Sequence, residues 1–311
     1  MMSERKGFLS VALLGALAVF PGAQPSAPAG APAAPATAAP ATPAAPAVSA
    51  TPPKEEFPPF KGFPVKLTEG ERLTYKVKWE AVDAGLATLT VKRKEQLGPG
   101  GPEVWNIQCR TRSNAFVSMF YEVRDDIKTF LDAKEGFTRL FDMNKNEGST
   151  HNVEHIEFDY DKAVANYTKT NVDKDTGKDK VKAKTIALPG KVHDPLSCLY
   201  YIRGLDLKVG GEYKLTVNTS KKNWVLTLRV VRREEQFIEG IGKVNALVIE
   251  PEAQFQGIFV RKGKMTVWVE EQTKVALMVK AAVPIGSASA VLVNAENSPL
   301  SKLKTVGGDK K

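Results

Sequence analysis

The sequence predicts a mainly β fold: a large, curved antiparallel sheet, either a sandwich or an open barrel, with one short helix. Three observations lead to this prediction. Apolar and polar residues alternate along most segments after Phe60, which is the period of strands with one buried face. Turn-forming groups such as LGPGGPE and KVGGEY recur between these segments. Only the segment Asp194–Gly204 has convincing helical spacing.

The beginning of the chain predicts export. Arg5 and Lys6 precede the apolar run GFLSVALLGALAVF, and small residues follow it. This order is typical of a secretory signal peptide, which we assign to residues 1–24. The run is short for a bilayer span, and no other segment approaches that length, so we expect no transmembrane segment in the mature chain. We therefore expect a periplasmic or secreted bacterial protein, with an uncleaved N-terminal anchor as the alternative.

Residues 25–60 consist almost entirely of Ala, Pro, Ser and Thr, without an amphipathic period. Proline disfavours both helix and sheet and promotes extended conformations. We predict a disordered tether here, followed by an antiparallel β domain over residues 61–296 and a disordered tail over residues 297–311.

The charge distribution argues against nucleic-acid binding. The formal net charge is +9, and Lys and Arg are scattered along the strands rather than gathered beside aromatic residues, as a nucleic-acid site requires. Weak attraction to an anionic membrane or polysaccharide is more consistent with this pattern.

Alternation places individual side chains on one strand face or the other. RLTYKVKWE and LATLTVK, joined by AVDAG, indicate a hairpin. Along KVALMVKAAV, alternation puts four residues on one face: Val275, Leu277, Val279 and Ala281. Trp268 is out of step with Val267 and Val269, so we expect it to face solvent or a partner.

The helix prediction begins at Asp194. Its carboxylate can accept backbone N–H groups of the first turn, and Pro195 suits the first helical position because no N–H is needed there. Leu196, Leu199 and Tyr200 then share one face, and Gly204 is suited to end the helix. Asp194 and Pro195 are thus explained as a structural helix cap.

No catalytic residues are expected. His193, Asp194 and Ser197 are too close in sequence to converge as a triad, and no GxSxG elbow exposes a serine. Cys198 lacks a convincing base. Glu270 and Glu271 are adjacent on a strand and point to opposite faces, so they make a poor carboxylate pair.

His151 and His155 could suggest a metal site, but the segment alternates like a strand. Four residues along a strand span about 13 Å, which is too far for two ligands of one ion. His155 and Glu157 share a face, yet two ligands do not close a site. We expect a solvated strand face.

The stretch NVDKDTGKDK superficially resembles a calcium loop through Asn171, Asp173 and Asp175. Its glycine, Gly177, comes one place late, and Lys182 occupies the position of the bidentate glutamate. A hairpin turn is the better interpretation. With no Gly-rich phosphate cradle after any strand, we expect neither metal nor cofactor.

Cys109 and Cys198 are the two cysteines of the chain. A disulfide between them is possible in an exported protein. Two buried free thiols are the alternative.

Three segments together resemble the bacterial domain of unknown function 3108 family: LTEGERLTYKVKWEAVDAGLATLTV, DPLSCLYYIRGLDLKVGGEYKL and GKMTVWVEEQTKVALMVKAAVPIGSASAVL. The resemblance covers about Phe63 to Val293 and implies an exported β-rich protein without an established activity. The family tends to have a small residue where Cys198 lies, which weakens any case for an essential thiol.

Three hypotheses about function follow. The first is a non-catalytic cell-envelope module that binds an apolar ligand or a lipid-linked glycan inside the curved sheet, although the same apolar residues could simply fill a core. The second is a structural envelope protein that docks onto a protein partner. The third, less favoured, is a glycan-active enzyme.

Overall fold

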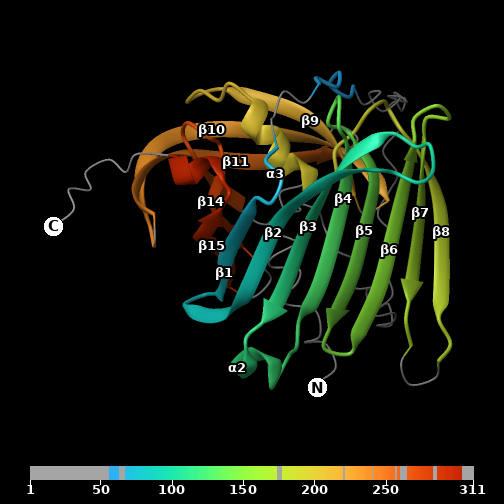
Figure 1. Ribbon diagram of the computed structural model, residues 1–311, viewed down its shortest axis with the longest axis horizontal. Coiled ribbons are helices and arrows are strands. Elements are labelled where there is room, and N and C mark those ends of the chain that lie inside the picture. The colour runs from blue at the N-terminus through green and yellow to red at the C-terminus, as the bar shows by residue number, and fades with distance from the viewer. Residues whose placement is uncertain are drawn as a thin grey trace, which may run out of the picture.

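The computed structural model describes residues 56–62, 67–173, 177–219, 221–239, 241–255, 258–259, 265–282 and 286–302. These residues form one 15-stranded antiparallel sheet in the order β8-β7-β6-β5-β4-β3-β2-β1-β15-β14-β13-β11-β10-β9, with β12 paired to β11 off this path. The edge strands β8 and β9 do not pair, so the curved sheet stays open (Figure 1). The predicted mainly β, antiparallel fold is confirmed.

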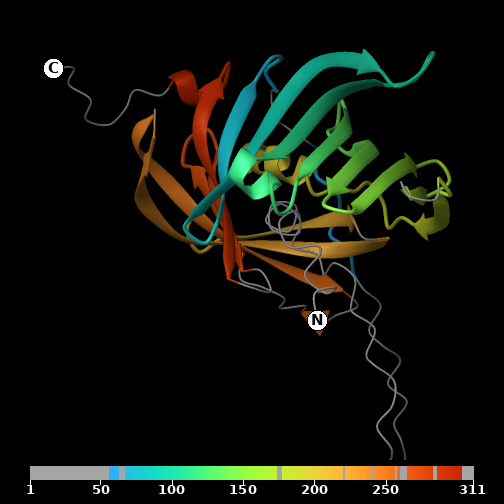
Figure 2. The same ribbon diagram turned by 90° about the horizontal axis from the view of Figure 1, so that it is seen from below.

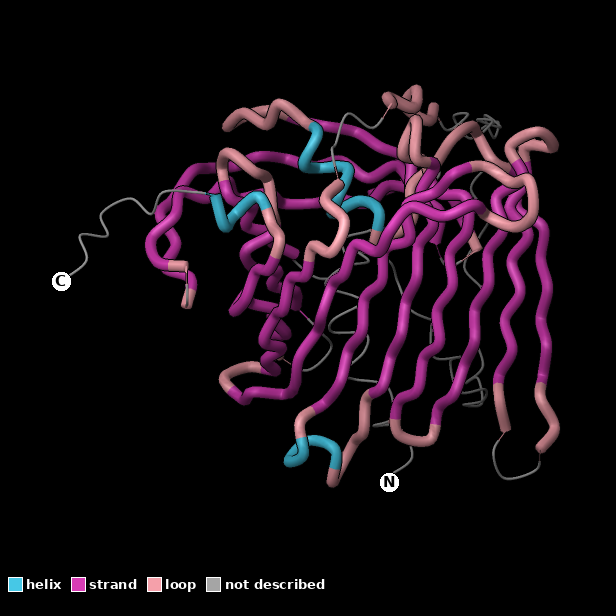
Figure 3. Tube along the Cα trace, in the orientation of Figure 1, coloured by secondary structure: helices cyan, strands magenta, loops and turns pink. Residues whose placement is uncertain are grey.

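The strands are β1 (Arg72–Trp79), β2 (Val82–Gln96), β3 (Glu103–Ser113), β4 (Arg124–Asp132), β5 (Thr138–Glu147), β6 (Thr150–Asp159), β7 (Val164–Asn171), β8 (Lys180–Ala187), β9 (Glu212–Thr219), β10 (Lys222–Ile238), β11 (Gly242–Phe255), β12 (Ile258–Phe259), β13 (Met265–Glu270), β14 (Ala276–Ala282) and β15 (Ser287–Glu296). The short helical segments are α2 (Ala115–Ser118), α3 (Ser197–Tyr201), η1 (Ile202–Gly204) and η2 (Pro299–Lys302) (Figure 3).

Two runs of sequential neighbours make up the sheet. β1 to β8 pair in chain order, and so do β9 to β15 apart from β12. The predicted first hairpin is present, with Leu73 opposite Leu89. β1 and β15 join the two runs, and their register extends from Arg72 opposite Glu296 to Trp79 opposite Ala288.

The core consists of two clusters of buried apolar side chains. The first draws mainly on β1 to β8, with further residues from β10, β11 and β13 to β15. The second draws on β9, β10, β11, β13 and β14. The helical segment lies inside the curve of the sheet (Figures 1 and 2), where Tyr200 belongs to the first cluster and Tyr201 to the second. The segment that leads from β8 to β9 therefore fills the space between the two parts of the sheet.

Trp268 does not face solvent, so this expectation was wrong. Its side chain is 8% exposed, and its indole N–H donates to Glu234 Oε1 at 2.6 Å. Val267 and Val269 pack in the second cluster, whereas Trp268 packs in the first. Both faces of β13 are covered, so a residue out of step with its neighbours is still buried.

The four apolar residues expected on one face of β14 divide between the two clusters. Val275 and Leu277 belong to the first, and Val279 and Ala281 to the second. The register with β13 shifts at this point, because Trp268 pairs with Met278 and Val269 with Ala276. This bulge leaves Leu277 without a partner and reverses the face to which the strand's side chains point.

Both ends of the described chain pack on the sheet. The Phe60 ring lies 6.0 Å from that of Phe137 and 5.3 Å from that of His193. Leu300 of η2 is buried in the first cluster. Residues 1–24, which we assign to a signal peptide, and residues 303–311 lie outside the described residues. Within the described part, no helix has the length and apolar character needed to cross a membrane.

Candidate functional site

The segment around Asp194 is a buried hydrogen-bond network. Oδ1 of Asp194 accepts the backbone N–H groups of Leu196 at 2.8 Å and Ser197 at 3.0 Å. Oδ2 accepts the hydroxyl groups of Thr138 at 2.7 Å and of Thr129. Asp194 has 0% of its surface exposed, so these four donors take the place of water around the carboxylate.

The hydrogen bonds are those of an N-terminal cap, although the regular helix begins later than expected. The N–H of Cys198 donates to the carbonyl of Asp194 at 3.2 Å, while Pro195 and Leu196 form a turn and α3 starts at Ser197. The helical segment ends at Gly204 without a left-handed φ angle there. Asp194 thus connects the start of the segment to β4 and β5, which carry the two threonines.

His193, Asp194 and Ser197 do not form a catalytic arrangement. The Ser197 hydroxyl donates to the carbonyl of Asp194 at 2.9 Å, and all three residues are buried. The His193 ring lies between Phe60 and Tyr201, and its Nδ1 atom has no hydrogen-bond partner among the described residues. Burial lowers the pKa of His193 to about 3, which keeps the imidazole neutral.

Cys109 and Cys198 are both free and buried, so the structure contains the free-thiol alternative and not the disulfide. Cys109 on β3 packs in the first cluster and Cys198 on α3 in the second, which separates the thiols. Burial raises the pKa of Cys109 to about 12 and raises that of Cys198 well above its usual value. Neither thiol has the low pKa and access that reactive cysteines require.

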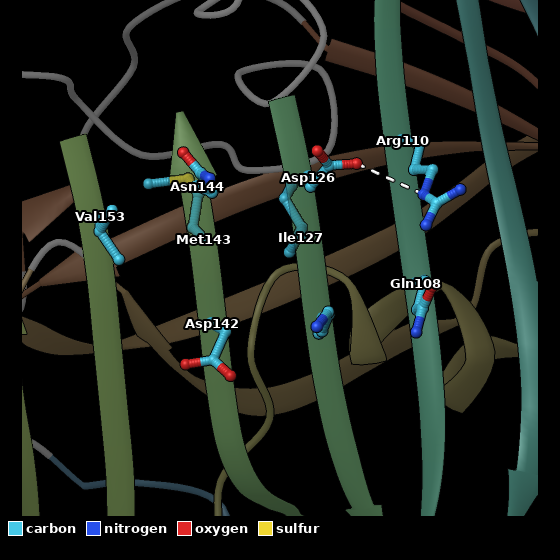
Figure 4. A pocket seen from close by; sticks show the side chains of 9 residues that line it. Gln108, Arg110, Asp126, Ile127, Asp142, Met143, Asn144 and Val153 are labelled. Atoms are coloured by element: carbon cyan, nitrogen blue, oxygen red, sulfur yellow. Dashed lines mark ion pairs between the residues drawn. The ribbon is translucent and has the colours of Figure 1, made fainter. Parts of the chain in front are cut away.

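A groove of about 380 Å³ crosses the outer face of β3 to β6 (Figure 4). Its lining residues are Gln108, Arg110, Asp126, Ile127, Lys128, Asp142, Met143, Asn144 and Val153. Most of its polar groups already bond within the sheet. Arg110 lies 3.4 Å from Asp126, which also accepts two hydrogen bonds from Arg112, at 2.8 and 2.9 Å.

The two histidines of β6 belong to this outer face. His155 Nδ1 lies 2.7 Å from Asp142 Oδ1, and His151 Nε2 lies 3.1 Å from Asn144 Oδ1. Each imidazole ring is therefore hydrogen-bonded to a different residue of β5. No group of metal-ligating side chains occurs among the described residues.

The calcium-like stretch connects β7 to β8. Asn171 ends β7, and the N–H of Gly177 donates to the carbonyl of Asp173 at 2.9 Å. Lys182 lies within β8, while Asp175 falls outside the described residues. The described part is a hairpin connection.

Glu270 and Glu271 have separate structural roles. Glu270 accepts the N–H groups of Gln272 at 3.0 Å and Thr273 at 2.6 Å and so holds the turn before β14. Glu271 pairs with Arg233 at 2.6 Å. The two carboxylates do not converge on one substrate position.

An exposed apolar surface, which the sequence analysis missed, lies where α2 meets the turn between β1 and β2. Phe116, Met119 and Phe120 are 60%, 71% and 78% exposed. We call this surface the apolar rim; it comprises Trp79, Val82, Leu86, Phe116, Met119 and Phe120. The signal in the sequence was the run AFVSMF, which interrupts the alternation between two strands.

Specific hydrogen bonds hold α2 in this exposed position. The Asn114 side chain accepts the N–H of Val117 at 2.8 Å and donates to the carbonyl of Asp83 at 2.6 Å. The N–H of Asn114 donates to Ala84 at 2.9 Å. None of the α2 residues is buried. The helix is therefore fixed to the β1–β2 hairpin with Val117 packed against the first core cluster, while Phe116 remains exposed.

Cations lie directly beside the apolar rim. Leu86 on β2 pairs with Lys76 on β1 and with Arg112 on β3, and the three side chains share the outer face. Five cations lie in this part of that face: Lys76, Lys78, Arg110, Arg112 and Arg124. Their carboxylate partners are Asp83, Asp126 and Glu122, and with Glu80 in the β1–β2 turn the local charge is about +1.

Glu147 is a buried carboxylate at the same end of the sheet. Its Oε2 lies 2.9 Å from Lys145 Nζ and 3.4 Å from the hydroxyl of Tyr121, which donates to it. Burial raises the pKa of Glu147 to about 7. The charge state of this group therefore changes near neutral pH.

The family described as "Protein of unknown function (DUF3108)" matches residues 74–293. The chain belongs to this family. The match spans β1 to β15, including the Asp194 network and the segment that forms α2, and so confirms the resemblance found in the sequence. No curated protein matches the chain.

Several solved structures are similar to the chain at low identity. A β-barrel-like DUF1849 protein from Brucella abortus has a TM-score of 0.44 at 11% identity, covering 74% of this chain and 99% of its own. A "putative lipoprotein" from Parabacteroides distasonis has a TM-score of 0.31 at 11% identity, covering 78% and 100%. A "putative exported protein" with a YmcC-like fold from Bacteroides fragilis has a TM-score of 0.26 at 10% identity, covering 76% and 99%.

Proposed function

We propose that this protein is an exported, non-catalytic module of the cell envelope that binds lipid through its apolar rim. The observation that carries the proposal is the exposure of Phe116 on α2 and of Met119 and Phe120 in the turn that follows it, at the end of the sheet. Clustered exposed apolar side chains are uncommon on soluble proteins and mark interaction surfaces. The signal-like N-terminus supports the envelope location.

The interior of the sheet is a less suitable place for an apolar ligand. The inward apolar side chains pack in the two clusters, and the α3 segment occupies the space between them. Tyr200 and Tyr201, on neighbouring positions of α3, are both buried there. Among the described residues, the rim is the place where three strongly exposed large apolar side chains, Phe116, Met119 and Phe120, lie close together in the sequence.

The surroundings of the rim favour an anionic bilayer surface as its partner. A membrane-binding surface combines apolar side chains that enter the acyl region with cations at the level of the headgroups. Leu86 has Lys76 and Arg112 as cross-strand neighbours, which provides this arrangement. A protein partner would need no such placement of cations.

Vesicle binding tests the proposal. Protein recovered from the periplasm of a bacterial host would be mixed with vesicles of phosphatidylcholine that contain phosphatidylglycerol as the anionic lipid, and the bound fraction measured by sedimentation. In the double variant Met119→Ser, Phe120→Ser, we expect a loss of about tenfold or more in partitioning, because two apolar side chains no longer leave water. Val181→Ser, Phe237→Ser is the matched control, since these residues are 63% and 72% exposed elsewhere.

The outcomes separate the proposals. Binding that falls in the rim variant and persists in the control supports lipid docking. Equal loss in both variants, or no vesicle binding by the wild type, overturns it. If the wild type self-associates, the rim variant does not, and both bind vesicles equally, the rim is a protein contact and not a lipid contact. Recovery only in the cytoplasm would overturn the proposed export.

A further inference from the structure

A second charged surface lies on the inner face of the edge strand β8. Side chains alternate along the strand, and Ile186 points inward because it belongs to the first core cluster. Lys180, Lys182 and Lys184 share its face, and all three are exposed. The inner face of this edge strand thus changes from apolar at Ile186 to cationic along the rest of its length.

These three lysines have no acidic partners among the described residues. The neighbouring strand shows the contrast, because Lys169 on β7 pairs with Glu154 at 2.8 Å. Lys182 stands directly opposite Lys169 in the register, and Glu154 is already engaged with it. Several uncompensated ammonium groups on one face repel one another and create a positive potential.

A fourth lysine reaches the same place from a different hairpin. Lys221, in the turn between β9 and β10, has its Nζ 5.0 Å from the centre of the Tyr167 ring. Lys184 is the cross-strand partner of Tyr167. The side chain of Asn223 donates to the carbonyl of Ala187 at 2.7 Å and holds this hairpin against the end of β8. Cations from both edges of the open sheet therefore approach one buried tyrosine.

We propose that Lys180, Lys182, Lys184 and Lys221, the lysine face, bind a ligand that carries several phosphate groups. Phosphates supply concentrated negative charge, and flexible ammonium groups from two elements can close around them. The same chemistry is offered by a phosphorylated lipid headgroup and by a soluble polyphosphate. The proposal goes beyond lipid docking at the apolar rim and does not depend on it.

Edge protection is the competing explanation for part of this surface. Lysines on an edge strand prevent pairing with another chain, and this would account for those on β8. It does not account for Lys221, which belongs to another hairpin and turns toward the same tyrosine. The two explanations predict different behaviour when the charges are removed.

Calorimetric titration with inorganic tripolyphosphate tests the proposal. For Lys182→Gln, Lys184→Gln we expect a loss of about tenfold or more in affinity, with a weaker dependence of binding on salt. The control is Lys92→Gln, Lys280→Gln, which removes the same charge from exposed strand positions and should change the affinity less than about twofold. Lys221→Gln should weaken binding without altering β8.

Vesicles of phosphatidylcholine that contain a lipid with a bisphosphorylated headgroup, used with the rim variant Met119→Ser, Phe120→Ser as background, identify the source of phosphate. If the lysine substitutions, added to the rim variant, remove both tripolyphosphate binding and the vesicle binding that the rim variant retains, the ligand is a lipid headgroup. If they remove tripolyphosphate binding alone, the ligand is soluble. Equal losses in lysine-face and control variants overturn the proposal, as does absence of tripolyphosphate binding by the wild type. A lysine-face variant that only dimerises, with unchanged affinity, establishes edge protection instead.

Discussion

Replacing Asp194 with alanine should lower the free energy of unfolding by about 4 kcal/mol. The carboxylate accepts four hydrogen bonds, from the N–H groups of Leu196 and Ser197 and the hydroxyls of two threonines. Each buried donor left without a partner costs ~1–3 kcal/mol, and we take the lower end because the hydroxyls can rotate toward other acceptors. This loss exceeds the ~0.5–2 kcal/mol typical of an exposed helix cap.

Asp194→Asn separates the two halves of the network. The side-chain oxygen of asparagine can still accept hydrogen bonds from the N–H groups of Leu196 and Ser197. Its NH₂ group replaces Oδ2 and cannot accept hydrogen bonds from the threonine hydroxyls. We therefore expect about half the loss of the alanine variant, ~2 kcal/mol. Asp206, whose side chain is 83% exposed, provides a control, and Asp206→Ala should change stability by less than about 0.5 kcal/mol.

Equilibrium urea denaturation, monitored by tryptophan fluorescence and by circular dichroism, measures these differences. The two probes should give coincident transitions if the domain unfolds as one unit. A loss below about 1 kcal/mol for Asp194→Ala, comparable to that of an exposed cap, would refute the account of a buried network. Equal losses for the alanine and asparagine variants would show that the backbone N–H groups of Leu196 and Ser197 contribute nothing, and an unchanged stability of the asparagine variant would show the same for the threonine hydroxyls.

Two buried titratable groups should give opposite pH dependences. The pKa of Glu147 is raised to about 7, so stability should fall as pH rises from 4.5 to 7; relative to Glu147→Gln, the wild type should lose up to about 3 kcal/mol over this interval. The pKa of His193 is lowered to about 3, so unfolding takes up a proton below pH 6.5; relative to His193→Phe, the wild type should lose about 2 kcal/mol between pH 7.5 and pH 5. Urea titrations at several pH values check both, and a difference that does not vary with pH would contradict either assignment.

Local patterns were sufficient to predict the hairpin of β1 and β2 and the helical segment after Asp194. The alternation of apolar and polar residues in the hairpin and the Asp194–Pro195 helix start both depend on nearby residues alone. Leu196, Leu199 and Tyr200 pack in the same core cluster, as their spacing predicted. The opposite face of that segment, with Cys198 and Tyr201, is also buried, which no local pattern could show, because burial there depends on strands that are distant in the sequence.

The errors have the same origin. Trp268 was expected to face solvent or a partner because alternation implies one wet face, but β13 has a core cluster on each side. On β14 the bulge at Leu277 reverses the facing of later residues, and a bulge leaves little trace in a single sequence. The apolar rim was missed because AFVSMF is as consistent with a buried strand as with an exposed helical turn.

The lysine face shows a further limit. Lys180, Lys182 and Lys184 alternate with Val181, Ala183 and Thr185, and in the sequence they belong to the Lys and Arg residues that are scattered along the strands. Their common inward direction follows from Ile186, and the approach of Lys221 follows from tertiary contacts. Sequence spacing defines which side chains share a face, whereas the fold decides toward what that face points.

The pairing of β1 with β15 sets a kinetic condition on the chain. Almost every other strand pair forms between sequence neighbours and can close a short loop, but this pair joins Arg72 to Glu296. Closing such a large loop is entropically slow, and it must await the last strand. Until then β1 and β14 each present an unpaired edge. A chain that ends before Ser287 would keep both edges permanently, so premature termination there should produce aggregates instead of a smaller folded protein.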